Sequence, residues 1–304
     1  MKPAPFEYRC PETLEEALSL LAEHGDEARP LAGGQSLVPA MSFRLARPAV
    51  LVDLNRIEEL AFVESAEDGG LAIGAMTRQR TVERSAPVRE RAPLLHETMP
   101  HIAHPQIRNR GTIGGSLAHA DPAAELPAIA LALDAELTLC SAGGERRVPA
   151  GEFYTSLFAT ALEPGELLTS IRLPAPAPNT GAAFEEVSRR HGDYALVGAA
   201  AVVTVDEESR IAAARLAYLS VGETPWLARE ATAELAGLAV SGTEQTVRDR
   251  FDQVSASAAA TADPPSDIHA SSAFRRHLMR VLGGRVLHRA TQQAAAMSTS
   301  GDTR

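Results

Sequence analysis

The sequence predicts an α+β protein built from more than one compact unit. Three observations lead to this prediction: an amphipathic helix near the N-terminus, a hairpin turn at residues 68–70, and a proline-rich linker at residues 174–178. At 304 residues, of which 45% are hydrophobic, the chain can bury a sizeable core divided among two or three units. We therefore expect helices and strands within each unit.

The first unit is expected to span residues 1–57. Thr13 and Glu16 form a capping-box pair, and the leucines that follow fall on one face of a helix that closes at Gly25. An extended run at 29–32 leads into a first glycine pair. Residues 49–54 have the length and β-branching of a buried strand.

The second unit is expected to span residues 58–177. Its runs 60–64 and 71–75 flank an Asp-Gly-Gly turn, which is typical of a hairpin. A mostly helical stretch over 81–102 precedes a second glycine pair, and Pro122 then opens a helix over 122–133.

The third unit is expected to span residues 181–290. Strand-like runs at 196–205 and 211–221 are followed by helical patterns at 228–236, 244–260 and 273–289. From residue 291 to 304 the apolar periodicity is lost, so we expect a disordered tail.

The two glycine pairs predict a site for an anion. The segments are Ala32-Gly33-Gly34-Gln35-Ser36-Leu37 and Thr112-Ile113-Gly114-Gly115-Ser116. Glycine pairs permit positive φ and leave no Cβ to hold a ligand away, so successive backbone N–H groups can converge on a phosphate. The second segment is expected to be a loop that delivers such donors next to a helix N-terminus. Neither segment matches the spaced glycines of the dinucleotide fingerprint or the P-loop. The alternative for each segment alone is a tight turn with a cap.

Composition excludes several partners and chemistries. The net charge of -10 offers no basic footprint for nucleic acid or an anionic membrane surface. Two cysteines, Cys10 and Cys140, are too few for an iron–sulfur cluster. No apolar run approaches the ~18 residues of a membrane span, and the N-terminus lacks the apolar run of a signal peptide, so we expect a cytoplasmic protein.

Histidines do not indicate a metal site or a hydrolase. His101 and His104 lie at helical spacing and His119 follows, but no recognised motif supplies a third metal ligand. Ser116, His119 and Asp121 are neighbours on one segment and cannot easily adopt the geometry of a catalytic triad. We therefore assign neither a metal ligand nor a catalytic residue.

An ordered set of motifs gives the chain a family resemblance. It comprises the first glycine segment, Ile73-Gly74-Ala75-Met76-Thr77, residues 105–117 with the second glycine segment, residues 121–128, residues 189–197 and residues 272–278. In this order they resemble the FAD-binding medium subunits of the molybdenum hydroxylase (xanthine oxidase) family, most closely those of the aerobic carbon monoxide dehydrogenase type.

The resemblance implies a fold and a cofactor. The fold would be an FAD-binding PCMH-type domain, related to vanillyl-alcohol oxidase and made of two subdomains, plus a C-terminal α+β domain like that of the CO dehydrogenase flavoprotein. The FAD pyrophosphate would lie between the glycine segments, with Asp121 and Glu125 accepting hydroxyl hydrogen bonds, Ala75 and Thr77 near the flavin, and Tyr194 against its ring. The implied contact residues are Ala32, Gly33, Gly34, Gln35, Ser36, Leu37, Ala75, Thr77, Ile107, Thr112, Ile113, Gly114, Gly115, Ser116, Ala118, Asp121, Glu125 and Tyr194.

The resemblance also implies partners and a role in electron transfer. A large subunit with a molybdenum cofactor would oxidise the substrate, and a small subunit would carry electrons through [2Fe–2S] clusters. FAD on this chain would pass them to an external acceptor, in a dimer of heterotrimers. Two alternatives stay open: a stand-alone FAD-dependent oxidase or dehydrogenase of a small molecule, and a flavin-free nucleotide-binding scaffold subunit.

Overall fold

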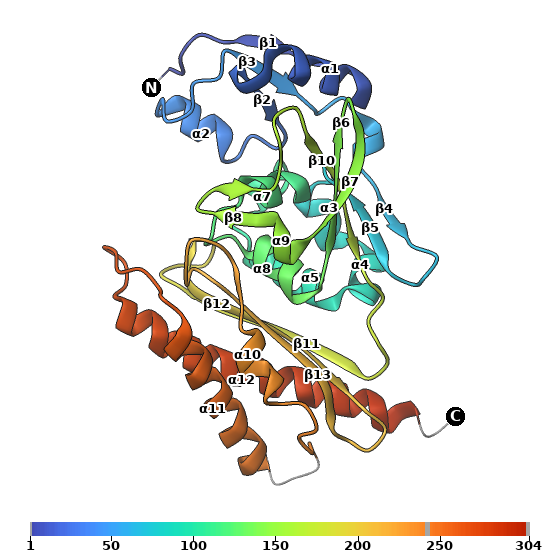
Figure 1. Cartoon of the computed structure of the whole chain (residues 1–304), viewed down its shortest axis with the longest axis vertical. Helices are drawn as coiled ribbons and strands as arrows, with labels where there is room; N and C mark the ends of the chain where they lie inside the picture. The colour runs from blue at the N-terminus through green and yellow to red at the C-terminus, as the bar shows by residue number, and fades with distance from the viewer. Residues whose placement is uncertain (1, 241–243, 302–304) are drawn as a thin grey trace.

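The computed structural model of the chain describes residues 2–240 and 244–301, and it has the mixed α+β architecture expected. Three sheets follow one another along the long axis of the molecule (Figure 1). A three-stranded parallel sheet lies at one end, a five-stranded antiparallel sheet lies in the middle, and a four-stranded antiparallel sheet with long helices lies at the other end. A two-stranded ribbon, β8-β9, flanks the middle sheet.

The N-terminal sheet has the order β1-β3-β2 and is covered by α1. The predicted capping of α1 is confirmed, because the Thr13 hydroxyl accepts a hydrogen bond from Glu16 N at 3.2 Å and Gly25 ends the helix with φ 49°. Its apolar face packs on β3, whose residues are all buried. The elements are β1 (Glu7–Arg9), α1 (Leu14–His24), η1 (Gly25–Glu27), β2 (Ala28–Leu31), α2 (Leu37–Ser42) and β3 (Val50–Asp53).

The middle sheet has the order β4-β5-β10-β6-β7. The predicted hairpin is confirmed as β4 and β5, joined through the turn at Gly69. Helices between β5 and β6 pack their apolar residues against this sheet. The elements are η2 (Glu58–Leu60), β4 (Val63–Ser65), β5 (Leu71–Gly74), α3 (Gln79–Arg84), α4 (Ala86–Arg91), α5 (Pro93–Thr98), η3 (Met99–His101), α6 (Pro105–Arg108), α7 (Ile113–His119), α8 (Glu125–Ala132), β6 (Glu136–Ser141), β7 (Gly144–Pro149), α9 (Ala150–Phe153), β8 (Tyr154–Ser156), β9 (Ala159–Thr160) and β10 (Leu167–Leu173).

The C-terminal sheet is buried on both faces. Along β12, Ala199 and Ala201 join the core formed with α11 and α12, whereas Ala200 joins the core of the middle unit. This double burial explains why the strand is a continuous apolar run without polar alternation. The elements are β11 (Thr180–Ser188), β12 (Ala195–Val205), β13 (Ile211–Leu219), β14 (Trp226–Leu227), α10 (Arg229–Ala233), α11 (Glu244–Thr261) and α12 (Ser272–Gly301).

Two expectations about helices are wrong. The predicted disordered tail is helical as far as Gly301, because α12 continues past residue 290 and buries Thr291 and Ala294 against the sheet; residues 302–304 lie outside the described residues. Helix α8 begins at Glu125 instead of Pro122, since the Asp121 carboxylate accepts a hydrogen bond from Ala123 N at 2.9 Å and holds a turn there. The limits of the three predicted units as separate domains stay a prediction.

Gly181 on β11 should be intolerant of any side chain. A Cβ at this position would lie 2.6 Å from Ala294 N and would also clash with the Ala290 carbonyl oxygen of α12. We expect Gly181→Ala to lower the free energy of unfolding by about 2 kcal/mol through overpacking, measured by urea denaturation. Gly222→Ala is the matched control, because a Cβ at Gly222 meets nothing closer than 3.8 Å. Equal stability of the two variants would contradict this account of the contact.

Candidate cofactor site

The structure brings the two glycine segments together through backbone contact. A Cβ on Gly33 would lie 2.7 Å from the Gly111 Cα and would clash with the Arg110 carbonyl oxygen. Nearby, a Cβ on Gly115 would lie 3.2 Å from the Ala32 Cβ. Glycine is therefore required at Gly33 because another main chain occupies the space that a side chain would need.

The first segment presents a row of free backbone donors. Gly34, with φ 72°, turns the chain before α2 begins at Leu37. Across the described residues, no protein acceptor takes a hydrogen bond from the backbone N–H of residues 33–37. The Gln35 amide donates to the Gly33 carbonyl at 3.1 Å, and the Ser36 hydroxyl makes no capping bond. Five consecutive amides at the start of a helix form a suitable site for an anion.

The second segment is a helix, and this corrects the expected donor loop. Thr112 caps α7, and its hydroxyl accepts a hydrogen bond from Gly115 N at 3.0 Å. Ile113 N donates to the Thr77 carbonyl at 3.0 Å, and Gly114 N donates to the Ala75 carbonyl at 2.8 Å. The first amides of α7 are thus already satisfied by the protein and are not available to a ligand.

Gly114 is expected from the sequence to offer its amide to an anion, but in the structure it allows close packing. A Cβ on Gly114 would lie 2.8 Å from the Ala75 Cα, so this glycine allows α7 to pack against the end of β5. Ala75 and Thr77 are buried, and their carbonyl groups accept the hydrogen bonds from the first amides of α7. Ser116 and Ala118 lie half-buried on α7, and the carbonyl of half-buried Ile107 accepts the hydrogen bond of Gly111 N at 2.7 Å. The second segment therefore contributes a close-packed wall and the Ser116 hydroxyl.

Asp121 and Tyr194 come together from different units. Ala120, in the left-handed conformation with φ 53°, ends α7 and leads to Asp121. Tyr194 lies in the turn between β11 and β12, where 61% of the residue is exposed. Partial desolvation, followed by the charge of Asp121 and a hydrogen bond to its carboxylate, raises the pKa of Tyr194 to about 12. Tyr194 is thus largely exposed, with its hydroxyl close to the Asp121 carboxylate.

The turn that carries Tyr194 is anchored on the middle unit. Gly192 has φ +88°, and a Cβ there would lie 2.7 Å from Nδ1 of His104. The position of Tyr194 therefore depends on contact between the C-terminal sheet and the segment that precedes α6.

Glu125 is buried, with 6% of the residue exposed, at the first position of α8. Burial raises its pKa to about 8, and the nearby Glu186 carboxylate acts in the same direction. His101 opposes this effect: its Nδ1 lies 3.4 Å from Glu186 Oε1, and Glu186 raises the pKa of His101. Glu125 is therefore mostly a neutral acid at pH 7, and in that form it can donate as well as accept a hydrogen bond.

Sequence reasoning did not assign Asn55 and Arg78 to the site. The Asn55 amide donates to the Ala32 carbonyl at 2.9 Å, and the Arg78 guanidinium donates to Asn55 Oδ1 and to the Arg110 carbonyl. The Asn55 side chain thus contacts the first glycine segment, and the Arg78 side chain contacts Arg110, two residues before the second segment. The available signal was their place shortly after predicted strands, which is too common to single them out.

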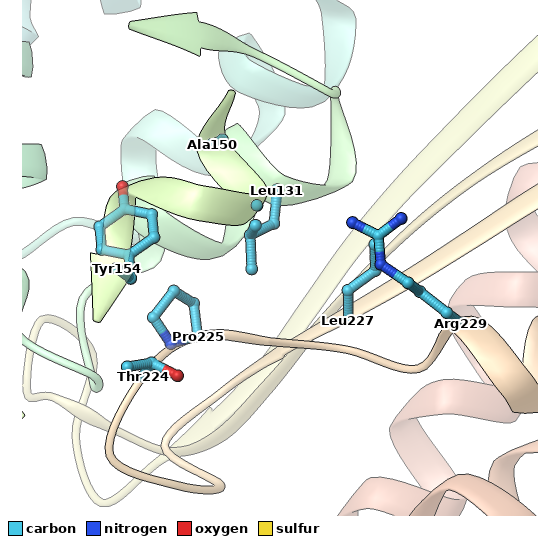
Figure 2. Close-up of a pocket in the computed structure, with 8 residues that line it drawn as sticks. Leu131, Ala150, Tyr154, Thr224, Pro225, Leu227 and Arg229 are labelled. Atoms are coloured by element: carbon cyan, nitrogen blue, oxygen red, sulfur yellow. The ribbon is translucent and has the colours of Figure 1, made fainter. Parts of the chain in front are cut away.

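A separate pocket of about 150 Å³ lies away from these residues, between α8, α9 and the loop before β14 (Figure 2). Leu131, Tyr154, Pro225 and Arg229 line it, and Figure 2 shows the Tyr154 hydroxyl turned away from Arg229. None of the predicted cofactor-binding residues lines this pocket.

Residues 2–240 and 244–301 contain no helix long and apolar enough to cross a membrane. They also contain no cluster of three or more His, Cys, Asp or Glu residues arranged to hold a metal ion.

Comparison with known proteins identifies the family of the chain. Residues 4–176 match the family model described as FAD binding domain in molybdopterin dehydrogenase, and residues 182–290 match the CO dehydrogenase flavoprotein C-terminal domain. The chain is 44% identical to the alpha subunit of the 6-hydroxypseudooxynicotine dehydrogenase complex of Paenarthrobacter nicotinovorans, over 99% of this chain and 100% of the relative.

Two further comparisons agree. The chain is 38% identical to the carbon monoxide dehydrogenase medium chain of Afipia carboxidovorans, over 97% of this chain and 99% of that one. A crystal structure of the Cu,Mo-CO dehydrogenase superposes with a TM-score of 0.90 at 38% identity, covering 96% of this chain and 100% of the other.

The raised pKa of Glu125 predicts a pH-dependent stability. Between its ordinary value of 4.5 and about 8, the folded chain holds a proton that the unfolded chain has released. The contribution of this group to stability is therefore complete below 4.5 and is lost as the pH rises through 8. In the cofactor-free protein, we expect the wild type to lose about 1 kcal/mol per pH unit relative to Glu125→Gln over this window.

Urea denaturation at a series of pH values measures this difference. The exposed substitution Glu90→Gln serves as the control and should follow the wild type at every pH. Parallel stability curves for the wild type and Glu125→Gln would show that Glu125 is ionised in the folded chain.

Proposed function

Because this chain belongs to the family of FAD-binding subunits of molybdopterin dehydrogenases, we propose that it accepts electrons from [2Fe–2S] clusters of a partner subunit and passes them to an external acceptor. The chain is an FAD-binding subunit of an oxidoreductase. The observation that carries the proposal is the row of free amides at residues 33–37, placed where the two glycine segments meet.

The residues present fit an FAD pyrophosphate. A dianion needs several convergent donors, and the amides of residues 33–37 together with the hydroxyls of Ser36 and Ser116 supply them. Gly33 and Gly115 leave no side chain in the way. In this proposal the first segment binds the pyrophosphate, while α7 forms the opposite wall.

The remaining residues orient the cofactor. Asp121 and Glu125 would accept hydrogen bonds from hydroxyl groups of the ribityl or ribose, and the exposed ring of Tyr194 would cover one face of the isoalloxazine. When bound, FAD supplies the exchange of one or two electrons. The chain itself binds, orients and partly shields the cofactor, and the proposal requires no acid–base residue acting on substrate.

The relatives support a role in electron transfer. Two relatives match almost the whole chain, at 44% and 38% identity, and belong to dehydrogenases of 6-hydroxypseudooxynicotine and of carbon monoxide. These two substrates are so different in size and chemistry that one binding pocket could not recognise both. A fold kept across such different substrates is expected of a subunit that handles electrons, while another subunit selects the substrate.

We propose partners on the same basis: a small iron–sulfur subunit and a large molybdenum-cofactor subunit, assembled as a dimer of heterotrimers. A cytoplasmic location is part of this proposal. Co-purification of the native complex, followed by metal analysis and mass measurement, tests it. A chain that purifies alone, retains FAD and oxidises a small molecule would favour the stand-alone oxidase, and a chain that stays colourless with FAD would favour the scaffold.

Ser36→Ala tests the pyrophosphate site. The Ser36 hydroxyl makes no capping bond within the protein, so its removal should leave the stability of the cofactor-free chain unchanged. We expect FAD to bind roughly 10-fold more weakly, because one hydrogen bond to a charged group is lost. Fluorescence titration of the cofactor-free chain measures the dissociation constant, with the exposed Ser65→Ala as control. Unchanged affinity would place the pyrophosphate elsewhere.

Tyr194 should be recognisable from the fluorescence of bound FAD. We expect Tyr194→Phe to keep the flavin fluorescence quenched, because the phenyl ring still stacks, and Tyr194→Leu to release it several-fold. A loss of quenching in Tyr194→Phe would show that the hydroxyl and its bond to Asp121 matter more than the ring.

A further inference from the structure

We propose that Asn55 and Arg78 form a polar clamp that joins the two glycine segments and thereby sets the affinity of the chain for FAD. The proposal rests on the FAD site described above and adds two residues that position it. Neither residue needs to touch the cofactor, so both would be positioning residues.

Asn55 holds the first segment. It lies two residues after the end of β3, and its side-chain amide donates to Asp53 Oδ1 and, at 2.9 Å, to the carbonyl of Ala32, one residue before Gly33. Asn55 is itself held from behind. Its backbone N–H donates to Asp53 Oδ1 at 2.9 Å, and the Tyr8 hydroxyl donates to the other oxygen of that carboxylate at 2.7 Å. The first glycine segment is therefore tied to the parallel sheet through one side chain.

Arg78 joins Asn55 to the second segment. One guanidinium nitrogen donates to Asn55 Oδ1, and another donates to the carbonyl of Arg110. This carbonyl is the group against which Gly33 packs. The backbone of Arg78 also forms a bridge with Thr112, the residue that caps α7. The clamp thus runs from Ala32 through Asn55 and Arg78 to Arg110.

The chemistry of Arg78 suits a clamp. No carboxylate of the described residues lies within ion-pair distance of it, although the charge of Asp53 opposes the burial that lowers the pKa of its guanidinium, and its two identified acceptors are neutral oxygens on different elements. A planar guanidinium can span two such acceptors at once, whereas the ammonium of lysine is a compact point charge. Lysine at this position would keep the positive charge but could not hold both acceptors in the fixed geometry of the planar guanidinium.

The clamp matters for binding because it orders the donors in advance. The free amides of residues 33–37 start immediately after Ala32, which Asn55 fixes. Without the clamp, the segment would have to be ordered when FAD binds, and this entropy would be subtracted from the affinity. Removal of either member should therefore weaken FAD binding more than it destabilises the fold.

The test is a titration of the cofactor-free chain with FAD, using Asn55→Ala, Arg78→Met, Arg78→Lys and the double variant Asn55→Ala/Arg78→Met. We expect each single variant, Arg78→Lys included, to raise the dissociation constant roughly 10-fold. The double variant should be no weaker than the singles, because the two residues act as one unit. Bound-flavin fluorescence should rise in all of them as the cofactor becomes more mobile.

Arg215→Met is the matched control. Arg215 also bridges a backbone carbonyl, that of Leu131 at 2.7 Å, and a side-chain oxygen, that of Asp134 at 2.8 Å, but at the C-terminal end of α8, away from Glu125. Its removal should change the melting temperature without changing the FAD dissociation constant.

Three results would overturn the clamp. If Arg78→Lys binds FAD as tightly as the wild type while Arg78→Met binds it more weakly in a salt-dependent way, the positive charge of Arg78 and not its fork geometry sets the FAD affinity. Lower melting temperatures with unchanged FAD affinity would assign it to the fold alone. If the losses of FAD binding free energy in the two single variants add up in the double variant, the two residues act independently and do not form one clamp. Failure of the wild-type chain to bind FAD would instead contradict the proposed function.

Discussion

The close approach of two main chains at Gly33 and Gly111 is the contact on which the cofactor site depends. It brings the end of a parallel sheet within van der Waals distance of the segment that precedes α7. Backbone can meet backbone there only because no Cβ intervenes. Beside this contact, the backbone amides of residues 33–37 have no protein acceptor among the described residues. Free amides at the start of a helix are available to bind an anion.

The two sides of the site are therefore not equivalent. The first segment offers free hydrogen-bond donors. The first backbone amides of α7, in contrast, already donate to Thr77, Ala75 and Thr112, so α7 contributes a close-packed surface. Glycines serve different purposes on the two sides. Gly34 allows a turn with positive φ, while Gly114 allows a helix to lie against β5. In the proposed site, a close-packed wall opposite a row of free amides would give a phosphate both its hydrogen bonds and its position.

The C-terminal unit contributes to the site through its own burial. Because β12 is covered by α12 on one face and by the middle unit on the other, the turn before it is held against His104, and Tyr194 reaches Asp121. The buried carboxyls of Glu125 and Glu186, with His101 between the units, lie at the same junction. Any movement between the units would therefore change the position of Tyr194 relative to Asp121.

The sequence by itself determined the elements with local signals and the family. The cap at Thr13, the hairpin turn at Gly69 and the ordered motifs around both glycine pairs depend on neighbours in the chain, and the structure and the relatives agree with them. Only the tertiary structure decided which glycine amides stay free, because that depends on distant carbonyls of Ala75 and Thr77. The order of residues 291–301 and the link from Asn55 through Arg78 to Arg110 likewise arise from contacts between remote segments, which local periodicity does not encode.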